Sequence, residues 1–343
     1  MKAIKVSANG KAGIQEVSLP ELRDGCVLVK VSCVAVNPID WVNLDFQAIP
    51  GSTLGCDFSG TVAEIGPKVN KTFDKGERVC GWVVGNNKAQ KDEGGFAEYC
   101  VASVDLLMRV PESMSDEEAA SPPAGVATAG MGLFQKHGMV LPDQAEDGKG
   151  EPVLVYGGTS ATATLAIQYA KLAGYEAITT CSPRSFGHVK SLGASAAFDY
   201  NDPECAAKIR DYTADKLTKV LDCISKDDSP RICADAISSK GGTISCTLPY
   251  PEDIGRKDVE VKMIFTLGIG GKDSGYGDQV IPGNPDDFEF GARMYAVAER
   301  LFREGKVSVH PPKVSSDGLE GVLGGLEAVK NGKASGVKLV YKL

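Results

Sequence analysis

From residue 153 to residue 267 the sequence alternates between short apolar segments and segments with a helical period, and this alternation limits the possible folds more than any other feature. Residues 153–156 have the character of a buried strand, and residues 160–172 have the pattern of a helix that Gly174 closes. The alternation predicts an α/β domain with a doubly wound parallel sheet that has helices on both faces. Further strands are expected at residues 177–181, 196–200, 220–224, 243–248 and 259–267, and further helices at residues 185–192, 203–212 and 228–237.

The residues before this region have a different character. Residues 2–110 consist of short β-rich runs separated by Gly, Pro and Asn, which predicts a β-rich domain. Ser115, with Glu118 three residues later, is typical of a capping box that begins a helix ending near Pro122. A second helix is expected over residues 125–137.

A chain of 343 residues is too long for one hydrophobic core and suits two domains. We expect the β-rich domain to span residues 1–124 and the parallel-sheet domain to span residues 125–284. Residues 285–343, with a helix at 288–303 and a strand at 337–342, are expected to return to the first domain.

The composition excludes several classes of protein. Lys and Arg number 37 against 45 Asp and Glu, and the net charge of −8 argues against nucleic acid and membranes as partners. The amino terminus lacks a continuous apolar core, and no run approaches the ~18 apolar residues that span a bilayer. The cysteines are scattered and several lie in strand-like runs, which favours free thiols in a reducing compartment. We therefore expect a cytoplasmic protein.

A turn of small residues joins the first strand of the alternating region to its helix, where a dinucleotide-binding fold has its phosphate loop. Small side chains let the backbone turn tightly, so that the free N–H groups of the helix face a pyrophosphate. Ala163 stands where a strict G-x-G-x-x-G motif has its last glycine, and the hydroxyl groups of the turn are further candidate phosphate ligands. A purely structural turn is the alternative. The candidate phosphate-binding residues are Gly157, Gly158, Thr159, Ser160, Ala161 and Thr162.

The end of the second strand bears on the choice between NADH and NADPH. About 20 residues beyond the loop, an NAD-binding site usually carries an acid that binds the ribose 2′-hydroxyl. This chain has no carboxylate there, and Ser182, Pro183, Arg184 and Ser185 match a 2′-phosphate better, so the predicted cofactor is NADPH. Arg184 has an alternative interpretation as a solvated residue at a helix start. Tyr200 is interpreted either as a contact of the adenine or the 2′-phosphate, or as a core residue.

Several motifs together resemble one known family. The phosphate loop, the domain order and the segment Glu-Gly-Gly-Phe-Ala-Glu-Tyr at residues 93–99 resemble the medium-chain dehydrogenase/reductase superfamily over nearly the whole chain, on its quinone-reductase side. Residues 155–163, 181–183, 191–194 with 198–200, and 221–224 resemble the fungal trans-acting enoyl reductases, which serve iterative polyketide synthases.

This resemblance implies a GroES-like catalytic domain, a Rossmann domain and NADPH as the hydride donor. The implied acceptor is an α,β-unsaturated polyketide thioester, carried by a polyketide synthase or by a synthase–peptide synthetase hybrid.

The resemblance also implies roles for individual residues, and each apolar one has an alternative interpretation as ordinary packing. It places Asn37, Asp40, Trp41, Val42 and Thr128 at the nicotinamide end of the cleft, with Asp40 and Thr128 as the candidate catalytic residues. Further contacts of the nicotinamide are implied for Leu248, Leu267, Gly268, Val340 and Tyr341. The implied acceptor pocket includes Ala129, Gly130, Met131, Leu133, Phe134 and Ile269.

Two departures from the resemblance bear on the chemistry. Zinc-dependent relatives bind the metal through a Cys and a His-Glu pair, whereas the corresponding positions here resemble Asn37 and Cys56-Asp57, so no metal is expected. Close relatives carry a lysine at the end of Asn-Pro-x-Asp-x-Lys, where this sequence has Val42. The donor to the developing negative charge on the carbonyl oxygen is then Thr128, a water molecule or the substrate carrier.

Three functional hypotheses follow. The first is NADPH-dependent ene-reduction in trans with a polyketide synthase. The second is a recruited relative that acts on a free intermediate, by reduction of a ring enone or a carbonyl or by a redox-neutral step. The third is a non-catalytic NADPH-binding partner. We also expect a monomer, because the loop at residues 270–287 is placed to block the exposed edge of the last parallel strand.

Overall fold

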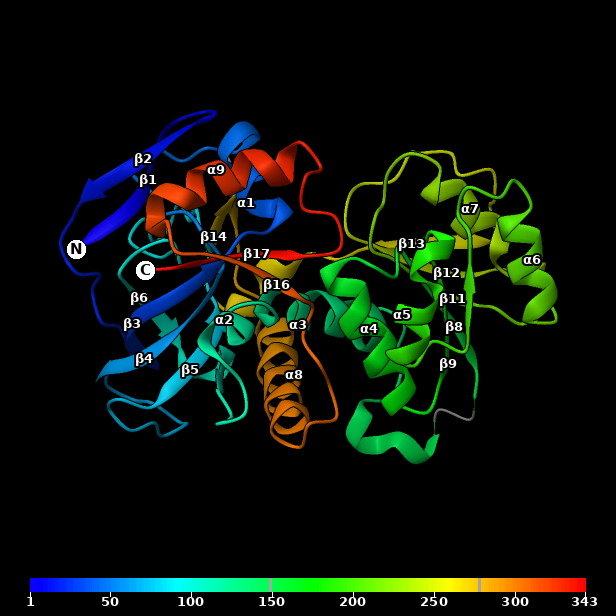
Figure 1. Cartoon of the computed structure of the whole chain (residues 1–343), viewed down its shortest axis with the longest axis horizontal. Helices are drawn as coiled ribbons and strands as arrows, with labels where there is room; N and C mark the ends of the chain where they lie inside the picture. Colours follow the sequence, from blue (N-terminus) through cyan, green and yellow to red (C-terminus); the bar gives the residue numbers. More distant parts are fainter. Residues whose placement is uncertain (148–149, 277–278) are drawn as a thin grey trace. The chain divides into compact units, whose positions relative to one another are not determined.

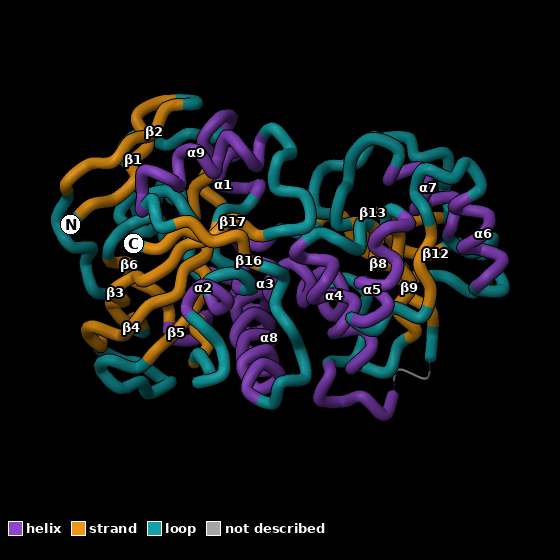
Figure 2. The backbone as a smooth tube through the Cα atoms, viewed as in Figure 1, coloured by secondary structure: helices purple, strands orange, loops and turns teal. Residues whose placement is uncertain are grey.

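The computed structural model describes residues 1–147, 150–276 and 279–343, which form two compact units. Unit 1 contains residues 1–127 and 267–343, and unit 2 contains residues 128–266. Figure 1 labels the elements of each unit, and Figure 2 distinguishes their helices from their strands.

The second boundary differs from the one predicted after residue 284, because the segment that follows residue 266 packs within unit 1. The Gly275 N–H donates to Asn87 Oδ1 at 3.3 Å, and Ile269 lies against Gly291.

Unit 1 is built on a sheet with the strand order β16-β17-β3-β4-β5-β7, in which β6 also pairs with β3. Its longest strand, β3 (Cys26–Ala35), is buried along almost its whole length. The C-terminal strand β17 (Lys338–Lys342) pairs antiparallel with β3, with Val340 opposite Ala35, so the tail of the chain lies in unit 1. The other strands are β1 (Lys2–Ala8), β2 (Lys11–Glu16), β4 (Asp57–Ile65), β5 (Arg78–Trp82), β6 (Tyr99–Ser103), β7 (Leu107–Arg109), β14 (Ser274–Tyr276), β15 (Gln279–Ile281) and β16 (Pro312–Ser315).

The helices of unit 1 include two that the sequence predicted, α2 (Asp116–Ala119) and α8 (Pro285–Arg303), and two that it did not. Ser115 and Glu118 form the predicted capping box of α2, since the Glu118 N–H donates to Ser115 Oγ at 3.2 Å. Neither α1 (Pro38–Phe46) nor α9 (Gly318–Lys330) was expected. Segment η1 (Val104–Leu106) also belongs to unit 1, whereas α3 (Pro123–Gly130) and η5 (Thr266–Gly270) each cross a boundary between the two units.

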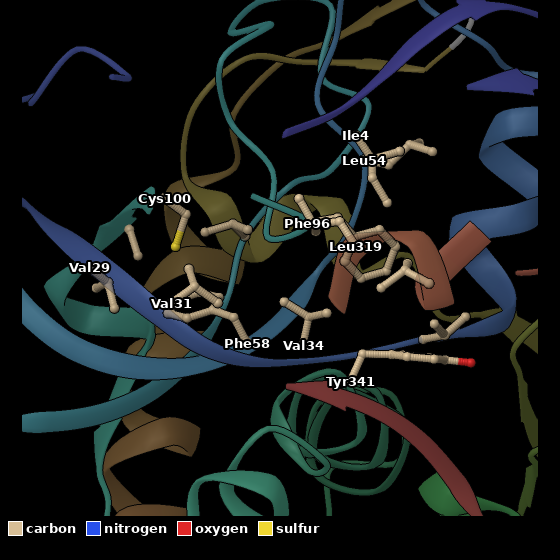
Figure 3. Packing of buried hydrophobic residues seen from close by; sticks show 14 of the residues in the cluster. Ile4, Val29, Val31, Val34, Leu54, Phe58, Phe96, Cys100, Leu319 and Tyr341 are labelled. Carbon is tan, nitrogen blue, oxygen red and sulfur yellow. The ribbon is translucent and has the colours of Figure 1, made fainter. Parts of the chain in front are cut away.

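The core of unit 1 lies between its sheet and helix α9. Phe58, Phe96 and Val34 are fully buried there, and Leu319 of α9 and Tyr341 of β17 join them, as Figure 3 shows. Packing of apolar side chains from strands at both ends of the sequence therefore fixes the position of the C-terminal strand.

Unit 2 has a parallel sheet with the strand order β10-β9-β8-β11-β12-β13. The chain winds outward from β8 to β10, returns to β11 beside β8, and then winds outward in the other direction, which confirms the predicted doubly wound sheet. The strands are β8 (Pro152–Tyr156), β9 (Glu176–Thr180), β10 (Ala196–Phe198), β11 (Lys219–Asp222), β12 (Gly242–Cys246) and β13 (Val259–Met263). The helical segments are α4 (Ala161–Leu172), α5 (Phe186–Ser191), α6 (Cys205–Tyr212), α7 (Ser229–Ala236), η3 (Pro142–Asp147) and η4 (Pro183–Ser185).

The helix predicted over residues 125–137 is not continuous. The α-helical part ends at Gly130, and η2 (Met131–Gln135) continues as a π-helical segment. Gly132 lies so close to the sheet that a Cβ atom on it would be 2.7 Å from Leu221 Cδ1. Two glycines and this close approach explain why regular α-helix is not retained here.

Candidate functional site

The turn between β8 and α4 has a geometry that only small residues permit. Gly157 has a φ of +82°, and a Cβ atom on Gly158 would overlap the Thr179 hydroxyl. The Gly157 N–H donates to Thr180 Oγ1 at 3.0 Å, and the Gly158 N–H donates to the Thr180 carbonyl at 2.8 Å. The turn is therefore held against the carboxyl end of β9.

Helix α4 presents its amino end at this turn. Ser160 is the N-cap residue, and its hydroxyl accepts a hydrogen bond from the Ala163 N–H at 3.2 Å. Thr159, Ala161 and Thr162 are half-buried beside it. The free N–H groups of a helix amino end carry partial positive charge and suit a phosphate group. The turn and the helix end thus fit the pyrophosphate of a dinucleotide.

The loop that follows β11 contacts the same turn. The sheet order reverses between β8 and β11, which is where parallel sheets of this kind bind dinucleotides. A Cβ atom on Gly157 would be 2.5 Å from Ile224 Cγ1, and the Cys223 thiol lies beside the Ser160 hydroxyl. Burial raises the pKa of that thiol above its usual range.

The carboxyl end of β9 carries the segment predicted to bind the 2′-phosphate. Arg184 and Pro183 are exposed, whereas Ser182 and Ser185 are half-buried. In the described part of the chain no carboxylate lies within ion-pair distance of Arg184. Tyr200 is 44% exposed, so its interpretation as a core residue is wrong. Leu248, just after β12, is 41% exposed.

Four of the predicted residues of unit 1, Asn37, Asp40, Trp41 and Val42, lie in the first turns of α1 or at its N-cap. Asn37 is the N-cap, and its N–H donates to Asp40 Oδ2 at 2.7 Å, which forms a capping box that the sequence analysis did not assign. Asp40 is 2% exposed, and its other oxygen has no hydrogen-bond partner among the described residues. Burial raises the pKa of Asp40 to about 7, and the charge of Asp57 adds to the effect. Trp41 and Val42 are half-buried on the next turn.

A buried ion pair lies beside this helix end. Lys338 Nζ donates to Asp57 Oδ2 at 3.0 Å and to the Asn37 side-chain oxygen, while Asn37 Nδ2 donates to Asp57 Oδ2 at 2.8 Å. The other Asp57 oxygen accepts from the Ala124 N–H at 2.7 Å. These bonds join four segments of unit 1, at residues 37, 57, 124 and 338.

The same residues do not fit a zinc ion. Asn37 and Asp57 are bonded to each other, and an ammonium group occupies the position next to the carboxylate. Cys56 lies beside Asp40, and its burial raises the pKa of the thiol well above the usual range. Zinc binds thiolate and neutral imidazole, and it is repelled by a neighbouring cation. The described residues also contain no group of three or more His, Cys, Asp or Glu side chains arranged to hold a metal.

The apolar candidates pack inside their own units. Val340 and Tyr341 are buried in unit 1, where the Tyr341 ring lies against Gly321 and Gly325 of α9. Leu267 is half-buried, and buried Gly268 lies against Asp287. Thr128 is half-buried on α3. The acceptor-pocket candidates Ala129, Gly130, Met131, Leu133, Phe134 and Ile269 are buried.

The candidates are divided between the two units. The group in unit 1 consists of Asn37, Asp40, Trp41, Val42, Leu267, Gly268, Ile269, Val340 and Tyr341. The phosphate turn, the Ser182–Ser185 segment, Tyr200, Leu248 and residues 128–134 belong to unit 2. Asp222 was not among the predicted site residues, although the motif Leu-Asp-Cys-Ile at the end of a predicted strand was a signal for it.

Two family models match the chain and agree with this architecture. The alcohol dehydrogenase GroES-like domain matches residues 23–112, and the zinc-binding dehydrogenase domain matches residues 161–275. An alcohol dehydrogenase superfamily protein from Novosphingobium aromaticivorans has a similar fold, with a TM-score of 0.79 at 22% identity over 100% of this chain and 99% of that chain. The fold and the glycine turn thus define a member of the medium-chain dehydrogenase/reductases.

Similarity in sequence is higher within one branch of that superfamily. A trans-enoyl reductase of Alternaria alternata is 42% identical over 100% of this chain and 98% of its own length. A trans-enoyl reductase of Penicillium oxalicum is 39% identical over 100% of this chain and 96% of its own length. The chain therefore belongs to the fungal trans-enoyl reductase family of the medium-chain dehydrogenase/reductase superfamily.

Membership in this superfamily makes the chain an oxidoreductase, and its Rossmann-type unit implies a nicotinamide cofactor. Within residues 1–147, 150–276 and 279–343, no helix has the length and apolar character needed to cross a bilayer.

Proposed function

We propose that this protein uses NADPH to reduce the α,β-double bond of a polyketide thioester, and that it acts in trans with a polyketide synthase or a synthase–peptide synthetase hybrid. The observation that carries the proposal is the full-length similarity to trans-enoyl reductases at 42% and 39% identity. The choice of NADPH rests on the exposed Arg184 and the lack of a carboxylate at the end of β9.

Each group of candidate residues has a part in this proposal. The pyrophosphate binds against the glycine turn and the backbone N–H groups at the amino end of α4, while the Gly157 and Gly158 N–H groups hold the turn to β9. Ser182, Arg184 and Ser185 bind the 2′-phosphate. In unit 2, Tyr200 contacts the adenosine end and Leu248 flanks the nicotinamide. The apolar residues 129–134 bind the acyl chain and exclude water.

When bound, NADPH supplies a hydride to the β-carbon of the acceptor. Thr128 donates a hydrogen bond to the carbonyl oxygen, on which negative charge develops before the α-carbon takes a proton. Asp40 holds the amino end of α1 through its bond with the Asn37 N–H. Because burial raises the pKa of Asp40 to about 7, this carboxyl also keeps a proton at mildly acidic pH.

One observation favours a second function. Val42 is half-buried on α1, at the position where the resemblance expects a lysine. A chain without that ammonium group is a candidate enzyme for a free intermediate of the pathway. It would reduce a ring enone or a carbonyl, or catalyse a redox-neutral step. A non-catalytic NADPH-binding partner is the third possibility.

A turnover assay separates these functions. The purified chain is mixed with NADPH and one of three acceptors: a short enoyl pantetheine thioester, the same acyl group on a carrier protein, or a free cyclic enone. Oxidation of NADPH with the thioesters supports the proposal. Oxidation with the enone alone supports the second function, and no oxidation of bound NADPH by any acceptor in a single turnover supports the third. Co-expression with a candidate synthase, with product saturation as the readout, then tests the partnership.

A substitution tests the role of Thr128. Thr128→Val keeps the shape of the side chain and removes the hydroxyl group. We expect hydride transfer to slow by roughly a hundredfold, because one oxyanion donor contributes on the order of a hundredfold or more. Wild-type activity in this variant, measured under conditions where hydride transfer limits the rate, contradicts the assignment.

A further inference from the structure

A fully buried carboxylate stands at the carboxyl end of β11. The Asp222 side chain has 0% exposure, and each of its two carboxylate oxygens accepts two hydrogen bonds. Oδ1 accepts from the backbone N–H groups of Ile224 at 2.8 Å and Ser225 at 2.9 Å. Oδ2 accepts from the hydroxyl groups of Ser229 and Tyr250, each at 2.6 Å. Four donors compensate the loss of hydration of this charge.

These bonds fix two loops that leave the same edge of the sheet. Ser225 Oγ donates to the Asp222 carbonyl at 3.0 Å and accepts from the Thr247 N–H at 2.9 Å, so the loop after β11 is tied to the loop after β12. Ser225 and Asp227 have φ angles of 57° and 56°, a backbone region that residues other than glycine rarely adopt. The bonds to Asp222 therefore impose a conformation that this loop would not favour alone.

The first of these loops reaches the phosphate turn. Ile224, whose N–H is bonded to Asp222, is the residue that lies directly against Gly157. The second loop begins with Thr247 and exposed Leu248, which is the candidate neighbour of the nicotinamide. The hydrogen bonds of the Asp222 carboxylate go to Ile224, Ser225, Ser229 and Tyr250, whereas the residues proposed to bind the adenosine end follow β9 and β10.

We propose that Asp222 is a positioning residue for the nicotinamide half of the cofactor. It holds the loops after β11 and β12 in the shape that accepts this half, through Ile224 and Tyr250. The adenosine half is bound independently by the segment after β9. This inference rests on the proposed function, because it takes NADPH as the ligand.

A matched pair of tyrosine variants tests the inference. Tyr250→Phe removes one hydroxyl donor to Asp222. Tyr212→Phe is the control, since it removes a hydroxyl that donates to Glu176 Oε1 at 2.8 Å, at the start of β9 and away from these loops. Both variants and the wild type are titrated with NADPH and with 2′,5′-ADP, which contains the adenosine end and its 5′-phosphate but lacks the nicotinamide half.

We expect Tyr250→Phe to raise the Kd of NADPH about tenfold, as loss of a hydrogen bond to a charged group does, and to change the Kd of 2′,5′-ADP less than about twofold. The KM for NADPH is expected to rise, whereas kcat at saturating NADPH is expected to stay close to the wild-type value. Tyr212→Phe is expected to leave both Kd values unchanged.

Asp222→Asn is expected to raise the Kd of NADPH more than Tyr250→Phe does. If that variant does not fold, Tyr250→Phe carries the test by itself.

Two results overturn the inference while leaving the proposed function intact. One is an unchanged Kd for NADPH in Tyr250→Phe. The other is a parallel weakening of NADPH and 2′,5′-ADP, which is the pattern of general destabilisation. Failure of the wild type to bind NADPH at all contradicts the proposed function itself.

Discussion

At the scale of single residues, Arg184 decides the proposed preference for NADPH. A charge-assisted hydrogen bond contributes about 1.5–3 kcal/mol, which corresponds to roughly tenfold to a hundredfold in affinity. We expect Arg184→Ala to lower the ratio of NADPH to NADH affinity by about that factor, measured by titration with each cofactor. Lys190→Ala is the control, because Lys190 is a nearby exposed cation on α5, and this variant is expected to keep the wild-type ratio. An unchanged ratio in Arg184→Ala makes this arginine an ordinary surface residue.

His137 gives unit 2 a pH-dependent stability. Its Nε2 lies 2.9 Å from both the Val220 carbonyl and Ser245 Oγ, and burial lowers the pKa of His137 from 6.5 to about 4. Between these two pH values the unfolded chain binds a proton that the folded chain does not, so stability falls as the pH decreases through this window. The expected loss is about 3 kcal/mol.

Urea denaturation at neutral and mildly acidic pH measures this loss. We expect His137→Gln to lose less stability between the two conditions than the wild type does. His188→Gln, at an exposed histidine of α5, is expected to follow the wild type. Identical pH dependence in His137→Gln and the wild type contradicts the prediction.

At the scale of single elements, helix α1 carries the departure that most affects the chemistry. Its amino end is fixed by the Asn37–Asp40 capping box, so a side chain at position 42 on the following turn has a defined direction. A lysine near the developing enolate is worth about as much as an oxyanion-hole donor, ~2.7–4 kcal/mol. If simple enoyl reduction is retained, Val42→Lys is expected to raise turnover of a short enoyl thioester at least about tenfold, with allowance for imperfect placement.

Val42→Met controls for side-chain length without charge. It is expected to leave turnover close to the wild type. In the opposite outcome, Val42→Lys gives no gain with the simple thioester and lowers turnover of the native substrate, because the added charge enters surroundings suited to an apolar side chain. That outcome means that the site has been adapted to other chemistry.

The elements of unit 2 were predictable because their apolar periods are regular. The strand expected at 153–156 is β8 (Pro152–Tyr156), and the helix expected at 160–172 is α4 with Ser160 as its N-cap. Helix α9 was missed because Gly321 and Gly325 lower its helix propensity, and their purpose appears only in three dimensions, where they make room for the Tyr341 ring.

Only part of the candidate site has a local signal in the sequence. Local signals marked the phosphate turn, because tight turns require small residues at fixed positions. No local signal connects Lys338 with Asp57, or Tyr250 with Asp222, since each pair is joined only by the folding of distant segments. The buried polar contacts that position the site therefore required the structure.

At the scale of the whole molecule, the association of copies depends on the edge strands of the sheets. Strand β13 is the edge of the parallel sheet, and its Val261 and Met263 side chains are exposed. The loop at residues 270–287 was predicted to block this edge. Residues 277 and 278 of that loop lie outside the described residues, and its Gly275 N–H is bonded to Asn87 of unit 1. In the described chain β13 pairs with β12 alone. The expected monomer therefore needs an explanation that does not depend on this loop.

Charge on the strand supplies that explanation. Glu260 and Lys262 lie on β13, paired to each other at 3.1 Å, and charged side chains on an edge strand disfavour the addition of a second strand. The net charge of −8 adds repulsion between copies. We expect light scattering after gel filtration to give the monomer mass of 36.0 kDa. A stable mass of about twice that value contradicts the prediction. Val261→Lys then tests where the copies meet, because an added charge at this position dissociates a dimer formed through β13 and leaves any other dimer intact.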